Sequence, residues 1–103
     1  MRRVDGVVIG RVNELIKFYH KTRGVWLLPT RIRFWREKGL LEGCIVGESK
    51  GHHFYFDIYK TAIRLDRIFA YKKFNRLSLA EIRLAIIGKM NDEEFMISRK
   101  GEV

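Results

Sequence analysis

Arginines are the residues of this chain best suited to binding chemistry, and two of them lie two positions apart in a segment that is predicted to be helical. A guanidinium can donate paired hydrogen bonds to guanine O6 and N7, or it can grip a phosphate. We therefore expect Arg31 and Arg33 to contact nucleic acid, and the alternative is a solvated helix face. Thr30, Phe34 and Lys38 share the same outward edge. Thr30 could meet a thymine methyl or a phosphate, and Phe34 could lie against a sugar or belong to the core.

Basic residues recur on two further predicted elements. Lys50 and His53 belong to a predicted hairpin, where an ammonium or a protonated imidazole could contact phosphate. Lys60, Arg64 and Arg67 repeat on one side of the helix predicted to follow the hairpin. We expect these three to make phosphate contacts that do not depend on base sequence, and the alternative is a solvated helix back.

Patterns for catalysis and metal binding are missing from the sequence. There is no G-x-S-x-G, no Walker loop and no recognisable Cys/His pair, so we expect neither an enzyme nor a cofactor. His20 and Cys44 lack the spacing of a structural zinc site, so no metal is expected. Cys44 is the single cysteine and cannot form an internal disulfide, which favours a cytoplasmic location.

The charge of the chain indicates an anionic partner. Lysine and arginine total 21 against 12 acidic residues, which gives a formal net charge of +9 over 103 residues. Ten of these bases, with only three acids, lie in residues 1–38. Such an excess repels itself, and a nucleic acid would relieve the repulsion; a generic basic surface is the alternative. No apolar run reaches the ~18–20 residues that span a bilayer, so no membrane partner is expected.

Apolar periodicity predicts four helices, over residues 10–20, 28–38, 57–74 and 78–88. Ile32 and Trp35 should face the core from the second of them. The helix boundaries are indicated by a glycine, a proline or capping side chains, namely Gly24, Pro29, Asp57, and Ser78 with Glu81.

Two short strand-like runs in residues 43–56 flank the turn-rich segment Gly47–Gly51 and predict a β-hairpin. The predicted fold is therefore mainly α with a β-hairpin wing: a winged helix-turn-helix of four helices and one hairpin. In that arrangement the second helix enters the major groove. We expect one such domain over 1–88, followed by a tail over 89–103 that is flexible or docks a partner through its apolar patch Phe95–Ile97.

Three motifs in order resemble the DNA-binding domain of the MerR-type regulators. Residues 31–41 (RIRFWREKGLL) are similar to that family's T-I-R-Y-Y-E-x-x-G-L-L, and residues 51–55 (GHHFY) to its wing sequence G-Y-R-x-Y. Residues 75–83 (NRLSLAEIR) are similar to G-F-S-L-x-E-I-R. The resemblance covers about residues 9–87 and implies a winged helix-turn-helix that binds DNA as a two-fold dimer and regulates transcription.

This chain departs from the family pattern at several positions. The segment between Leu15 and Ile32 is longer than usual, Arg31 replaces the signature threonine, and His53 replaces the wing arginine. Only 16 residues follow Ile87, so no small-molecule effector domain is expected. The main hypothesis is a small, cytoplasmic, nucleoid-associated regulator that binds specific double-stranded DNA, with a homodimer as one option. The alternatives are an excisionase-like or DNA-packaging architectural protein and, behind it, a basic protein that binds RNA or the ribosome.

Overall fold

Four helices form where the capping and periodicity signals predict them. The computed structural model describes residues 1–51 and 53–88. Each helix begins and ends within three residues of its predicted bounds: α1 is Val12–Arg23, α2 is Pro29–Glu37, α3 is Ile58–Phe74 and α4 is Leu79–Gly88. The predicted tail, including Phe95–Ile97, lies outside the described residues.

The predicted caps act as expected. Gly24 ends α1 with a left-handed φ of 73°, a conformation that glycine adopts without steric cost. The Asp57 carboxylate accepts a hydrogen bond from the backbone N–H of Lys60 at 3.1 Å and so begins α3. At the start of α4 the backbone N–H groups of Ser78 and Glu81 each donate to the other's side chain, at 3.0 and 3.2 Å.

The sheet is larger than predicted. The expected hairpin forms from β3 (Ile45–Ser49) and β4 (His53–Asp57), but a second hairpin, β1 (Arg2–Val4) with β2 (Val7–Gly10), pairs with it. All pairings are antiparallel and the strand order is β1-β2-β4-β3. The prediction of a single hairpin is therefore wrong. The described residues form a small α/β domain of four helices and a four-stranded antiparallel sheet.

The missed hairpin has a local cause. Asp5 and Gly6 connect paired Val4 and Val7, and their φ angles of 51° and 80° are both positive. Two positive φ values define the tight turn that Asp-Gly sequences favour between antiparallel strands. The Asp-Gly pair was the available signal for this hairpin.

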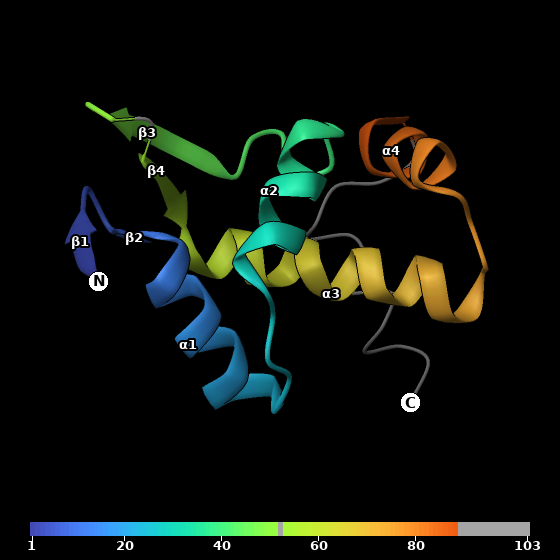
Figure 1. The fold of residues 1–103 in the computed structure, drawn as a ribbon, viewed down its shortest axis with the longest axis horizontal. Helices are drawn as coiled ribbons and strands as arrows, with labels where there is room; N and C mark the ends of the chain where they lie inside the picture. The colour runs from blue at the N-terminus through green and yellow to red at the C-terminus, as the bar shows by residue number, and fades with distance from the viewer. Residues whose placement is uncertain (52, 89–103) are drawn as a thin grey trace.

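Helix α3 is the central support of the domain. It runs along the length of the molecule, with α1 against its first half and α4 folded back over its second half (Figure 1). Ile32 and Trp35 are each only 1 % exposed, which confirms that α2 buries this face. The Trp35 ring meets Phe69 of α3 edge-on, with 5.4 Å between ring centroids. The hydrophobic core comes from every helix, the sheet and the connection between α2 and β3, and includes Leu15, Tyr19, Leu41, Phe56, Leu65, Ile68 and Ile82.

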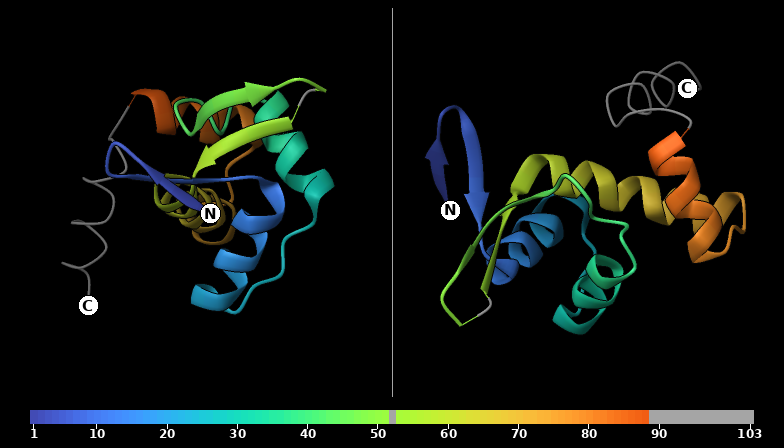
Figure 2. Two further views of the ribbon diagram at one scale, coloured as in Figure 1. Left: turned by 90° about the vertical axis from the view of Figure 1, so that its left-hand side faces the viewer. Right: turned by 90° about the horizontal axis from the view of Figure 1, so that it is seen from above.

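Helix α2 and the β3–β4 hairpin extend to the same side of the domain. The right-hand view of Figure 2 shows both projecting downwards, with α1 set back between them. An apolar inner face holds each of them to the core, so their outward faces are presented together. Among the described residues, no helix is both long and apolar enough to cross a membrane.

Candidate nucleic-acid interface

The outward edge predicted for α2 is exposed. Thr30, Arg31, Arg33 and Lys38 all face solvent, and Phe34 is 44 % exposed, so Phe34 lies outside the core. Burial of Ile32 and Trp35 fixes the rotation of the helix, because these side chains lie on its opposite side. Packing of α2 on the core therefore fixes which side chains this edge exposes to solvent.

One side of α2 forms a groove with the β3–β4 hairpin. The groove has a volume of about 270 Å³ and lies between the start of α1, α2 and strand β4. Three arginines and a histidine line it: Arg11, Arg33, Arg36 and His53. Its walls also include the apolar side chains of Val12, Ile32, Phe54 and Phe56. The structure thus brings together Arg33 and His53, which the sequence placed on separate elements.

Two of the groove arginines were missed by sequence reasoning. Arg36 lies one helical turn after Arg33, so the same i, i+3 spacing that gathers helix neighbours could have found it. Its guanidinium carbon lies 4.1 Å from the centre of the Phe54 ring, a cation–π contact that joins α2 to strand β4. Arg11 comes directly before α1, and only the pairing of β2 with β4 brings it beside the β3–β4 hairpin.

The other side of α2 has a different character. Leu28, Thr30, Arg31 and Phe34 line a second hollow of about 310 Å³ together with Lys72 of α3. The Lys38 ammonium lies 5.5 Å from the centre of the Phe34 ring. This side therefore combines exposed apolar surface with fewer basic side chains than the groove, which has three arginines and a histidine.

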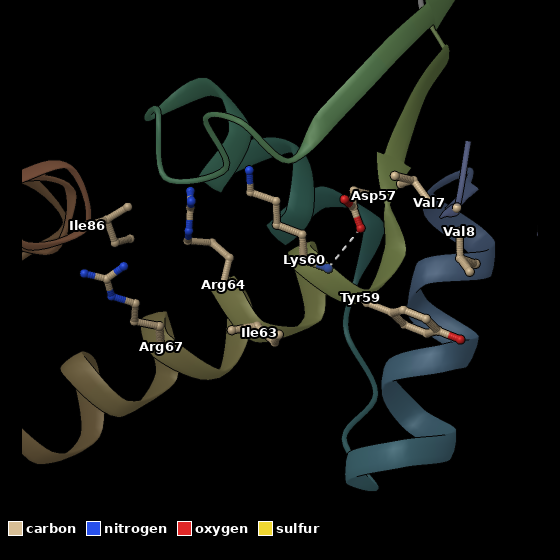
Figure 3. A pocket seen from close by; sticks show the side chains of 10 residues that line it. Val7, Val8, Asp57, Tyr59, Lys60, Ile63, Arg64, Arg67 and Ile86 are labelled. Carbon is tan, nitrogen blue, oxygen red and sulfur yellow. Dashed lines mark hydrogen bonds between the residues drawn. The ribbon is translucent and has the colours of Figure 1, made fainter. Parts of the chain in front are cut away.

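The remaining predicted residues lie away from the groove. Lys50 is exposed in the turn between β3 and β4, next to the start of the strand that carries His53. Lys60 is exposed and lines a third hollow of about 640 Å³ beside α3. Figure 3 shows Lys60, Arg64 and Arg67 following one side of α3 toward α4.

The sequence predicts phosphate contacts from Arg64 and Arg67, but neither side chain lies on a solvated side of α3. They are 7 % and 0 % exposed, because α4 and the connection between α2 and β3 cover this side of the helix. Arg64 Nη1 donates to the carbonyl oxygens of Leu40 and Glu42 at 3.1 and 2.8 Å. Arg67 Nη2 donates to the carbonyl oxygen of Ala85 at 2.9 Å. Both guanidiniums therefore bind the backbone of their own domain.

Within residues 1–51 and 53–88, no group of three His, Cys, Asp or Glu side chains could hold a metal ion. The groove offers hydrogen-bond donors with positive charge beside apolar side chains, which suits phosphates and base edges.

Comparison with known proteins adds no family to this description: no family model matches the chain, and neither a curated protein nor a solved structure shows significant similarity to it.

Proposed function

We propose that this protein binds specific double-stranded DNA as a small winged helix-turn-helix regulator, with α2 in the major groove and the β3–β4 hairpin on the flanking backbone. The observation that carries the proposal is the basic groove between α2 and the wing, lined by Arg11, Arg33, Arg36 and His53. The B-DNA major groove is about 12 Å wide and admits an α-helix, so a projecting helix with arginines can reach base edges. The net charge of +9 and the MerR-like motifs of residues 31–41 and 51–55 support the same function.

The roles within the site follow from position. Arg33 is exposed in the middle of α2, where a helix lying in a groove meets base edges, so it is the residue proposed to read sequence. Arg36 is held against Phe54, and His53 begins a wing strand, so both are proposed to contact phosphates. Arg31, Thr30 and Phe34 lie on the other side of the helix and are proposed to meet the opposite wall of the groove.

The test begins with selection of a preferred duplex from a random pool and uses two matched variants. Arg33→Ala should weaken binding to the selected duplex by ~1–3 kcal/mol and relax the preference at one base pair. Lys73→Ala is the control, since it also removes one exposed positive charge but lies in the last turn of α3. Fluorescence anisotropy at fixed salt measures both affinities, with an unselected duplex and a structured RNA as competitors.

Two results would count against this function. Equal losses in the two variants would mean that only net charge matters. A wild type that prefers structured RNA to every duplex would instead indicate RNA binding. The deep, narrow major groove of A-form RNA does not admit side chains that read bases, so α2 could not act there as proposed.

A further inference from the structure

The N-terminal hairpin brings one further arginine, Arg2, to the sheet beside the β3–β4 hairpin. Strand β2 pairs with β4, and β1 pairs with β2, so that Arg2 lies opposite Ile9 and Ile9 lies opposite Asp57. Directly paired residues share a face of the sheet, and residues two apart on one strand share it too. Arg2 therefore lies on the same face as Tyr55, which is two residues before Asp57.

Both guanidiniums meet at one phenol ring. The guanidinium carbons of Arg2 and Arg11 lie 5.7 and 5.5 Å from the centre of the Tyr55 ring. Arg11 Nη2 also donates a hydrogen bond to the Tyr55 hydroxyl at 3.3 Å. We call these three residues the Arg2–Arg11–Tyr55 cluster.

The cluster is an electropositive site. The hydrogen bond and the charge of Arg11, with a further contribution from Arg2, lower the pKa of Tyr55 from its usual 10.0. Among the described residues, no carboxylate forms an ion pair with either guanidinium. The nearby Glu14 carboxylate instead accepts the backbone N–H of Arg11 at 3.2 Å and pairs with the amino group of Met1. The two guanidiniums repel each other at this ring, and an anion that bridges them would relieve the repulsion.

The cluster is continuous with the groove beside α2. Arg11 belongs to both, because it lines that groove and also hydrogen-bonds to Tyr55. His53 lines the groove and shares the sheet face of Tyr55, two residues away on β4. A DNA backbone that leaves the groove past the wing would therefore meet the cluster next.

We propose that the Arg2–Arg11–Tyr55 cluster binds a phosphodiester of duplex DNA outside the base pairs read by α2, which makes the N-terminal hairpin a second backbone-binding element. The proposal rests on the DNA-binding function proposed above. The phosphate oxygens accept hydrogen bonds from Arg2, from the remaining N–H groups of Arg11 and from the Tyr55 hydroxyl. Contacts of this kind add affinity and fix position but carry no base preference.

Neighbouring arginines on β1 supply a matched pair of variants. Arg2→Ala removes a charge from the cluster, whereas Arg3→Ala removes an exposed charge from the other face of the same strand, because successive side chains alternate. Loss of one phosphate contact lowers the slope of log affinity against log salt by about 0.9. Between 50 and 200 mM salt the affinity of the wild type should therefore fall about 3.5-fold more than that of Arg2→Ala. Arg3→Ala should keep the wild-type slope.

A set of duplexes locates the contact. On a selected site with long flanks, Arg2→Ala should bind more weakly than Arg3→Ala, with the same base preference as the wild type. On a duplex trimmed to the selected base pairs, the two variants should bind equally. Tyr55, followed by NMR in protein with carbon-labelled tyrosine, reports the contact directly: its pKa should rise when the long duplex binds, because a phosphate offsets the guanidinium charges.

The failures are distinguishable. If Arg33→Ala loses base preference but Arg2→Ala and Arg3→Ala have the same salt slope, the cluster is not a phosphate site and the function of α2 stands. An effect of Arg2→Ala that persists on the trimmed duplex, or that changes base preference, also overturns the cluster as a flanking contact. A wild type that ignores duplex DNA overturns both proposals together.

Discussion

Replacement of Arg64 by methionine separates a structural role for this residue from a DNA-binding one. Its guanidinium donates to the carbonyl oxygens of Leu40 and Glu42, which belong to the connection between α2 and β3. This connection joins α2 to the β3–β4 hairpin. Methionine retains an apolar stem of similar length but donates no hydrogen bond, so Arg64→Met removes the link while it keeps most of the packing.

The magnitude follows from the two hydrogen bonds. A hydrogen bond that involves a charged group contributes about 1.5–3 kcal/mol to stability. Because Nη1 makes both bonds to the backbone, they do not add fully, and we expect a loss of about 3 kcal/mol in the free energy of unfolding. With a urea dependence of about 1.5 kcal/mol per molar, the unfolding midpoint should fall by roughly 2 M.

Urea denaturation followed by circular dichroism measures this shift. Lys60→Met is the matched control: Lys60 lies one helical turn earlier and carries the same charge, but it is exposed, so its unfolding free energy should change by no more than about 0.5 kcal/mol. An Arg64→Met protein with an unchanged midpoint and a lost affinity for DNA would refute the reasoning. That result would restore Arg64 as the phosphate contact that the sequence predicted.

Further expectations concern the core, a turn and a cap, and all are measurable by urea denaturation. Trp35→Ala should cost about 3–5 kcal/mol, since the buried indole holds α2 against the core. Gly39→Ala should cost about 1–2 kcal/mol, because φ is 79° there; an unchanged midpoint would mean that the turn relaxes. Ser78→Ala should cost about 1 kcal/mol as a lost N-cap. Hydrogen bonds from Ser78 lower the pKa of Glu81 from its usual 4.5, so the advantage of the wild type over Glu81→Gln should be present above about pH 4.5 and shrink as the pH falls through the lowered pKa; a constant difference across this range would contradict the pairing.

The amino-acid sequence alone determined the helices, the β3–β4 hairpin and the buried face of α2. Each depends on neighbours close along the chain. Asp57 caps α3 through a residue three positions away, and Ile32 and Trp35 share a face because of helical periodicity. The Asp5–Gly6 turn is just as local, so the N-terminal hairpin was also within reach of the sequence.

Only the tertiary structure decided which charged faces remain exposed. Periodicity places Arg64 and Arg67 opposite the apolar face of α3, and on a surface helix that side is solvated. Helix α3 is a central helix, however, and α4 and the α2–β3 connection cover its second side, so both arginines are buried on backbone carbonyls. A pattern within one helix does not reveal how many of its sides other elements will cover.

The basic groove was likewise a product of folding. Arg11, Arg33 and His53 come from three segments far apart in the chain. The pattern around each residue predicts only that its side chain is exposed. Local pattern fixes the face of an element on which a side chain lies, but it leaves open which elements meet. The pairing of β2 with β4 and the packing of α2 on the core settle that, because burial of their apolar faces leaves these basic side chains together at one opening.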